Sequence, residues 1–579
     1  MINIMQKENN HKGKKDINTN SKQWMNSFIY IIVYISIALA IAVCTKFIMK
    51  EEEPVSIANN SAEALVYEKK YDNAIAEYTI LQEKEQWPSY EMEIAKIYSI
   101  QGDFIKSNDV LQSVYEKRNK IIDADGKEKH IEEDKKLLND ILFTSMINGD
   151  SEKALEYGEV FLEEYPDDKN IMNTMFMVYM LNNKVNNAKM ILSTYPINEI
   201  TSSDLTKLAD MNALTNNYEK SLELLKEAWN MDNDNLEILN VLEQIYSNNK
   251  EYILTEVKKL SEENKDETIY KVWLAKLYSL DSKTLNEADK LISELEEKNI
   301  ENLNISFIKA DVYNELGKTK ESKSILNGIY EEYKESYVGS YAKAINEYNL
   351  SEYESALNSC KESILLNRDY AANYSVMLPK IMDALKQNEL EEPYLRIALE
   401  KEPYNYGLIL KMADYYSSVL KDSNKALYYY EFASKINPKD ADILYDMAII
   451  KVNTQRIDEA VELLNKAIKI DSTKSQYYRA LGSIYLTEEK NDSAIKAIRE
   501  GYAKDKDDVL NLNNAGCYYI IVEKNVSRAL TNLKAAYDGM DENTTDEQRK
   551  IITDNYNRVK AIEGNSNSAL TLTDFKLFY

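Results

Sequence analysis

Residues that could carry out chemistry are few in this chain of 579 residues, and they are widely separated. Only two histidines occur, and His130 opens the tetrapeptide His-Ile-Glu-Glu, which lacks the second histidine of an HExxH zinc site. The three cysteines, Cys44, Cys360 and Cys517, include no pair with zinc-ligand spacing and are too few for a disulfide framework. Glycine-rich phosphate loops and GxSxG nucleophile motifs do not occur in the sequence. We therefore expect a protein that is not an enzyme, with no metal, no cofactor and no small-molecule substrate.

The composition is that of an acidic, folded and largely helical chain. Asp and Glu number 97 against 71 Lys and Arg, which gives a formal net charge of −26. Such a surface repels phosphate backbones, so we expect no binding to nucleic acid. Hydrophobic residues make up 44% of the chain, enough for a core, and only 14 Gly and 8 Pro interrupt it. This scarcity of helix breakers is typical of helices joined by short turns.

A hydrophobic segment near the N-terminus is long enough to cross a membrane. Residues 28–44 form a run of 17 residues in which only Ser36 is polar. With its flanks the segment spans roughly 33 Å as a helix, against about 30 Å for a bilayer core. The run is longer than the apolar region of a cleaved signal peptide. It therefore predicts an uncleaved transmembrane anchor at residues 24–46, with cleavage or lipidation at Cys44 as alternatives.

The charges on either side of this segment predict its orientation. Five lysines lie in the preceding tail, residues 1–23, whereas the linker at residues 47–55 carries one lysine and the acidic run Glu51–Glu53. Because positive charge favours the cytoplasmic side, we expect a single-pass cell-membrane protein with its N-terminus in the cytoplasm and the rest outside. Lys46 and Lys50 act against this orientation, and a cytoplasmic location for the rest of the chain is the alternative.

Most of the remaining chain repeats with a period of 33 to 35 residues, which indicates a helical solenoid. The repeat is clearest at 441–474, where two amphipathic helical patterns flank a short polar turn. A marker residue, usually small, opens each second helical pattern, and another small residue often lies twelve positions before it. Glu391 is the one misfit among the markers, but Ala398 and Pro403 follow it at the spacings seen after Ala426. The fourteen markers are Ala74, Ser107, Ala154, Ala188, Ser221, Thr255, Ala288, Ser322, Ala356, Glu391, Ala426, Ala460, Ala494 and Ala529.

This pattern resembles the tetratricopeptide repeat family. At 441–474, Ala448, Ala460 and Ala467 occupy positions 8, 20 and 27 of a 34-residue unit, and tyrosines such as Tyr485 take position 11 in other units. The resemblance covers roughly residues 56–540 and is weaker near 240–300. It implies an all-α fold, a right-handed superhelical solenoid of about 14 helix-turn-helix repeats, preceded by the transmembrane helix.

Three segments depart from the repeat. The step between the second and third markers measures 47 residues, which places an insertion at 119–136, either an inert lengthened hairpin or loop, or a contact site. Residues 541–563 have the pattern of a capping helix, which a solenoid needs at a soluble end. The C-terminal tail, residues 564–579, is unusually apolar for a free end. It is either frayed or docked on the array or on a partner.

In tetratricopeptide arrays the first helix of each repeat lines a concave face that binds ligands. The mixture of aromatic and aliphatic groups expected there suits an extended peptide or a partner helix, although the same residues could instead pack inside a tight superhelix. The carboxylate clamp of the family is not matched, because Tyr415 and Asp446 stand where it needs asparagine. Carried over residue by residue, the resemblance implies a candidate groove made of Leu408, Lys411, Tyr415, Tyr445, Ile449, Val452, Arg479, Leu486, Asn513 and Ile520.

Together these features predict a non-enzymatic, membrane-anchored scaffold that binds protein or peptide partners. On family analogy its setting is cell-envelope assembly, secretion or surface-polymer assembly. The alternative is a membrane adaptor that faces the cytoplasm and recruits soluble proteins for quality control or regulation.

Overall fold

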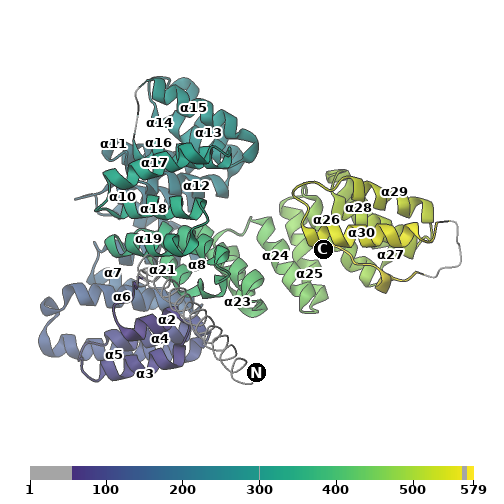
Figure 1. Cartoon of the computed structure of the whole chain (residues 1–579). Helices are drawn as coiled ribbons and strands as arrows, with labels where there is room; N and C mark the ends of the chain where they lie inside the picture. The colour runs from purple at the N-terminus through teal and green to yellow at the C-terminus, as the bar shows by residue number, and fades with distance from the viewer. Residues whose placement is uncertain (1–54, 299, 301, 564–569) are drawn as a thin grey trace, which may run out of the picture. The chain divides into compact units, whose positions relative to one another are not determined.

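In the computed structural model, which describes residues 55–298, 300, 302–563 and 570–579, every regular element is a helix. The helices pair into fourteen hairpins, followed by a single helix, α30 (Asp546–Lys560) (Figure 1). The prediction of an all-helical, tetratricopeptide-like solenoid is therefore confirmed for this part of the chain. The pairs are α2 (Ser61–Tyr67) with α3 (Tyr71–Gln82), α4 (Ser89–Gln101) with α5 (Phe104–Asp125), α6 (Ile131–Ile147) with α7 (Ser151–Glu164), α8 (Lys169–Leu181) with α9 (Val185–Thr194), α10 (Ser202–Leu214) with α11 (Tyr218–Met231), α12 (Glu237–Asn248) with α13 (Lys250–Glu263), α14 (Ile269–Ser279) with α15 (Leu285–Glu297), α16 (Leu303–Glu315) with α17 (Thr319–Glu332), α18 (Tyr337–Asn349) with α19 (Tyr353–Leu366), α20 (Leu378–Ala384) with α21 (Glu392–Lys401), α22 (Tyr406–Asp414) with α23 (Ser423–Ile436), α24 (Ala441–Asn453) with α25 (Ile457–Ile470), α26 (Ser475–Thr487) with α27 (Asn491–Lys504), and α28 (Val509–Ile521) with α29 (Val526–Asp538).

The turn inside each hairpin has a common backbone conformation. In twelve pairs a residue with positive φ lies five positions before the marker, and it ends the first helix in the left-handed conformation. Three of these residues are glycines and nine carry side chains, such as Asn183, Gln455 and Lys386. Lys386 lies five residues before Glu391, so the misfit marker sits in the same register as the others. The regular turn explains why the period is so constant along the chain.

The marker residues lie where the two helices of a hairpin touch. Except at 255 and 391, all of them are at most 1% exposed. Where serine replaces alanine, its hydroxyl donates to the carbonyl oxygen of the small residue twelve positions earlier, as Ser221 does to Ala209 at 2.6 Å. Ser107 and Ser322 make the same bond at 2.8 Å. A serine therefore fits this contact because its buried hydroxyl is satisfied.

Two glycines on first helices mark the closest approaches between paired helices. A Cβ atom at Gly482 would lie 2.7 Å from Ile498 Cγ1, and one at Gly516 would lie 2.5 Å from Leu533 Cγ. Any larger residue would push α26 from α27, or α28 from α29.

The sixth and seventh hairpins differ from the others. Neither has a positive-φ residue in its turn. In the sixth hairpin the expected marker, Thr255, is exposed. The buried position is Ile253, two residues earlier, because a single residue, Asn249, separates α12 from α13. The predicted register was therefore wrong at this repeat, in the stretch where the family resemblance was already weakest.

The insertion at 119–136 lies between the second and third hairpins, where it extends α5 and α6 and joins them through the short turn η1 (Lys127–Lys129). Its base is held by a buried ion pair in which Arg118 donates to both carboxylate oxygens of Asp134, with Nε 2.6 Å from Oδ1. Arg118 also binds Glu164 on α7, and the hydroxyl of Tyr165 donates to Asp134 at 2.7 Å. The insertion is thus an ordered part of the array.

Contacts between distant repeats form a long-range interface, in which α2, α4 and α6 contact α21 and α23. Lys96 on α4 lies 2.9 Å from Asp140 on α6 and 3.4 Å from Glu400 on α21. Further bonds join Arg396 to the Ser99 hydroxyl at 2.7 Å and Lys425 to the Ile100 carbonyl at 2.7 Å. The first repeats are therefore tied to the tenth and eleventh as well as to their own neighbours.

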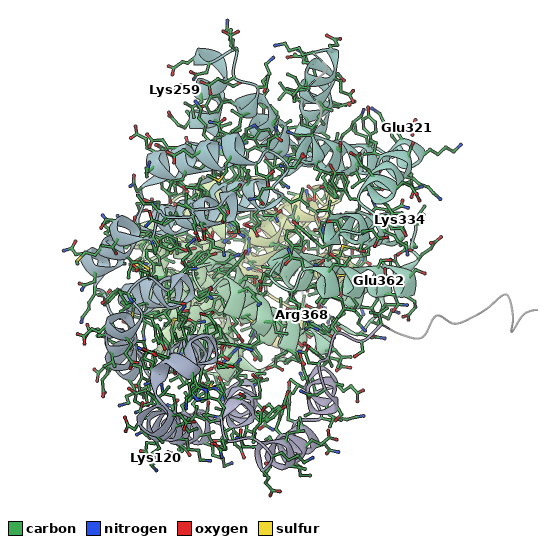
Figure 2. All side chains as sticks on the ribbon, turned by 90° about the vertical axis from the view of Figure 1, so that its left-hand side faces the viewer. Lys120, Lys259, Glu321, Lys334, Glu362 and Arg368 are labelled. Carbon is green, nitrogen blue, oxygen red and sulfur yellow. The ribbon has the colours of Figure 1, made fainter. Side chains whose placement is uncertain are left out.

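The outer surface of the array is charged. Side chains such as Lys120, Lys259 and Glu321 stand exposed on it (Figure 2). None of the helices among the described residues is long and apolar enough to cross a membrane. The predicted anchor at residues 24–46 lies outside the described residues, so it stays a prediction.

Candidate functional site

The last ten residues of the chain lie against its final repeats. Residues 570–579 begin with a short turn, η6 (Leu572–Asp574), closed by a capping box between Thr571 and Asp574, and Phe575 then enters an extended conformation. From there the segment contacts helices α30, α28, α26 and α24 in turn. We call the residues of these four helices that contact 570–579 the tail site. Of the two alternatives for the tail, docking on the array is therefore what the structure describes for these ten residues.

Two asparagines bind the main chain of Lys576. Asn555 on α30 accepts from the Lys576 N–H at 3.4 Å and donates to its carbonyl oxygen at 2.8 Å. Asn513 on α28 donates to the same oxygen at 3.3 Å and accepts from Asn555 at 3.0 Å. The side chain of Lys576 is exposed and takes no part in these bonds. This position of the tail is therefore held through its peptide group alone.

The main chain of Phe578 is held in the same way, two residues further on. Asn514 on α28 accepts from the Phe578 N–H at 3.0 Å and donates to its carbonyl oxygen at 2.6 Å. The Ser483 hydroxyl on α26 donates to that oxygen at 2.5 Å and accepts from Asn514 at 2.7 Å. The spacing of two residues matches an extended strand, in which alternate peptide groups face the same side.

Apolar side chains of the tail fill gaps between the helices. Phe575 is 7% exposed and joins a cluster with Cys517, Ile520 and Val559. Phe578 is 9% exposed and joins a second cluster with Leu512 and Ile552. Burial of an aromatic side chain stabilises by roughly 1.5–3 kcal/mol, so these two rings are the main apolar anchors of the segment.

The end of the tail lies on α24. The Tyr445 hydroxyl donates to the main-chain oxygen of Tyr579 at 3.1 Å, and the Tyr579 ring packs with the cluster that contains Ile449. Burial raises the pKa of Tyr445, so its hydroxyl stays protonated and able to donate at physiological pH. Nearby, Arg479 is held by Asp508 at 2.5 Å.

The predicted groove residues fall into two groups. Six share a hydrogen bond or an apolar cluster with the tail: Tyr445, Ile449, Val452, Leu486, Asn513 and Ile520. Four do not. Leu408 and Tyr415 are buried in the main core cluster, Lys411 donates to the Ser375 carbonyl, and Arg479 pairs with Asp508. Partner binding by these ten residues stays a prediction.

The predicted residues did not include three that bind the main chain of Lys576 and Phe578: Ser483, Asn514 and Asn555. Asn513 and Asn514 lie in a run with Asn511, in the interior of a helix where asparagine is unfavourable because it competes with backbone hydrogen bonds. Fully buried asparagine side chains at such positions need hydrogen-bond partners. The run therefore indicated that the main chain of another segment binds there.

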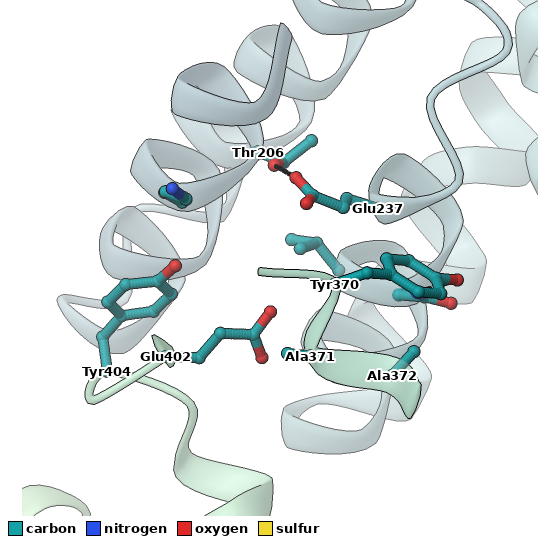
Figure 3. A pocket seen from close by; sticks show the side chains of 10 residues that line it. Thr206, Glu237, Tyr370, Ala371, Ala372, Glu402 and Tyr404 are labelled. Carbon is teal, nitrogen blue, oxygen red and sulfur yellow. Dashed lines mark hydrogen bonds between the residues drawn. The ribbon is translucent and has the colours of Figure 1, made fainter. Parts of the chain in front are cut away.

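A second candidate is a small pocket between α10, α12 and the loops before η3 (Asn373–Met377) and α22 (Figure 3). Its lining includes Glu237 and Glu402, and Thr206 donates to Glu237 at 3.2 Å. Burial, with the nearby charge of Glu237, raises the pKa of Glu402 to about 7. The lining has no cysteine or histidine.

Elsewhere in the described part of the chain, no cluster of three or more His, Cys, Asp or Glu residues could hold a metal ion. Cys360 and Cys517 are both free and buried, and burial raises the pKa of each thiol well above its usual value. Such thiols are poor nucleophiles.

Comparison with known proteins identifies part of the array. Residues 420–484 match the family model of the tetratricopeptide repeat. A curated relative, protein STIP1 homolog of Dictyostelium discoideum, is 31% identical over 93 residues, which cover 15% of this chain and 16% of that protein.

Similar solved structures include yeast Tom70, at 13% identity and a TM-score of 0.35 over 88% of this chain and 96% of that one. The Cut9–Hcn1 complex of the APC/C gives 12% identity and a TM-score of 0.34 over 86% of this chain and 95% of that one.

Proposed function

Since residues 420–484 are matched to the tetratricopeptide repeat family, we propose that this protein is a non-enzymatic scaffold that binds partner proteins in its tail site. The observation that carries the proposal is the pair of peptide groups, at Lys576 and Phe578, held by side chains of three helices. A site that can bind main-chain donors and acceptors suits any extended segment with suitable apolar side chains.

Energetics favour a binding role for this site over a purely structural one. Asn513 and Asn514 are fully buried. Each buried donor or acceptor of such a side chain that has no hydrogen-bond partner destabilises the fold by about 1–3 kcal/mol. A core built only for stability would use apolar side chains, since these need no partner. Polar side chains that bind a main chain are typical of a surface made to receive a peptide.

Photocrosslinking in intact cells tests this function. A photoreactive residue at Ile449, beside the tail, is expected to trap a discrete partner polypeptide. A synthetic peptide of residues 570–579, added to permeabilised cells, is expected to compete with that product. The matched control carries the same group at Lys466 on the exposed face of α25, and it is expected to trap nothing that the peptide displaces. Equal, peptide-insensitive products at both positions would contradict partner binding in the tail site.

We also propose that the chain is anchored in the cell membrane through residues 24–46, with the array outside the cytoplasm, in cell-envelope, secretion or surface-polymer assembly. The support is the 17-residue apolar run with five lysines before it. Lys46 and Lys50 after the run favour the second candidate, an adaptor that faces the cytoplasm.

Cysteine labelling separates these two orientations. Cys360 and Cys517 are fully buried, so a cysteine placed at the exposed residue Lys259 is expected to give the main thiol signal of the folded array. A membrane-impermeant maleimide should label the Lys259→Cys variant in intact cells if the array is outside. The chain without the Lys259→Cys substitution is the control, because any label that it takes up can come from Cys44. Labelling that requires lysis would instead favour the cytoplasmic adaptor.

A further inference from the structure

The tail site is already filled by the chain itself. The main chain of Lys576 and Phe578 takes up the side-chain amide groups of Asn555 and Asn514, and the two phenylalanines occupy the gaps between helices. A second segment cannot bind there until these residues leave, since both would need the same donors and acceptors. Any ligand of the site therefore competes with the tail.

We propose that the tail site captures an extended partner segment of the same kind as Phe575–Tyr579, and that the chain's own tail closes the site until such a segment displaces it. The inference rests on the proposed function and names its ligand. The partner segment has an aromatic residue, any residue, an aliphatic residue and two aromatic residues in succession.

The contacts of each tail residue define this pattern. Phe575 and Phe578 are buried, so both positions need a large apolar side chain. Leu577 and Tyr579 are partly buried against neighbouring clusters, which favours an apolar group there. Lys576 is exposed and is bound only through its peptide group, so its position accepts any residue except proline, which has no N–H.

The strength of the closure follows from the tether. Residues 570–579 follow α30 after only nine residues, 561–569, and a connection this short gives an effective concentration of about 1 mM. If the free segment binds the open site with a Kd of about 10 μM, the attached tail weakens the apparent affinity for an added peptide about 100-fold. Removing the tail from the site should raise the apparent affinity for the added peptide by the same factor.

A binding assay with the full-length protein in detergent tests the proposal. The probe is a fluorescent peptide of residues 570–579, followed by anisotropy. The Phe578→Asp variant cannot bury its own tail and is expected to bind the peptide about 100-fold more tightly than the natural chain. Tyr579→Ala, which loses only the contacts at the end of the tail, is expected to show a smaller gain. Lys576→Ala is the matched control and is expected to show no change, because only its main chain is bound.

The outcomes separate this inference from the proposed function. Tighter binding by Phe578→Asp that is lost when Asn514→Ala is added supports the inference. Equal affinity of the natural chain and both tail variants overturns it, even if crosslinking from Ile449 still traps a partner. No binding by any variant overturns it as well, while the crosslinking result alone decides the proposed function. If Phe578→Asp fails to fold, as judged by thermal unfolding, the Tyr579→Ala result decides.

Discussion

Replacing Asn514 with alanine tests how the tail is held. In the native chain this side chain accepts from the Phe578 N–H at 3.0 Å, and donates to the Phe578 carbonyl at 2.6 Å and to the Ser483 hydroxyl at 2.7 Å. In Asn514→Ala the carbonyl keeps its bond from Ser483, which is 2.5 Å away. The Phe578 N–H keeps no partner, and the residue is only 9% exposed.

The size of the effect can be worked out from these groups. A buried N–H without a partner costs about 1–3 kcal/mol, and the lost bond to the carbonyl removes about 1 kcal/mol more. The docked tail should therefore be destabilised by about 2–4 kcal/mol. Since about 1.4 kcal/mol corresponds to a factor of ten, the equilibrium for docking should fall roughly 30- to 700-fold.

Hydrogen exchange measured by mass spectrometry is the assay. The peptide that contains residues 575–579 should lose at least about 30-fold in protection in Asn514→Ala, and at most all of the protection that docking gives, because local opening then becomes much easier. Asn465→Ala is the matched control, since Asn465 is exposed on α25 and donates only to the Val461 carbonyl of its own helix at 2.8 Å. Protection within about threefold of the natural chain would refute the reasoning that Asn514 holds the tail.

Three further predictions concern the array. Gly516→Val should destabilise the fold by about 1–3 kcal/mol in chemical denaturation, because its Cβ would meet a leucine of α29; Gly328→Ala, with nothing within 4 Å, should be neutral or stabilising. Arg118→Gln should lower the free energy of unfolding by about 3–5 kcal/mol in the same measurement, because it leaves the buried carboxylate of Asp134 without its partner. Adding Asp134→Asn to this variant should recover part of that loss, because the unpaired charge is then removed. Burial raises the pKa of Glu402 from 4.5 in the unfolded chain to about 7 in the folded chain. Between these two pH values the folded chain binds more protons than the unfolded chain, so the stability that protonated Glu402 contributes is lost as the pH rises to about 7. Glu402→Gln should therefore lose less unfolding free energy than the natural chain between about pH 5 and about pH 7.5, and an equal loss would contradict this account.

The repeat could be predicted because one physical constraint recurs at one spacing. Paired helices touch only where side chains are small, so Ala460 and its equivalents appear every 33 to 35 residues and are buried as expected. At Thr255 the prediction failed, because the turn there is a single residue and a larger side chain, Ile253, takes the contact. Spacing alone could not detect a change in turn geometry.

The tail site could be predicted only in part. Family positions located residues such as Asn513 and Tyr445, because first helices present the same face in each repeat. Asn555 lies on α30, outside the repeat, and no repeat position refers to it. The register of the tail depends on which peptide group meets which asparagine, and that pairing joins residues 64 positions apart. No local pattern in the sequence contains such information.

The long-range interface has a consequence for how the chain is made. In an ordinary solenoid each repeat can fold as soon as its neighbour is present. Here Lys96 and Glu400 are 304 residues apart, and Lys425 is 325 residues from the Ile100 carbonyl that it binds. At roughly 5–20 residues per second, a ribosome needs about 15–60 s to supply the second half of these contacts. During that time the first repeats expose one face without its partner, including Lys96 and the rings of Tyr67 and Phe104, so synthesis of this chain includes an interval in which a chaperone has an aromatic and charged surface to bind.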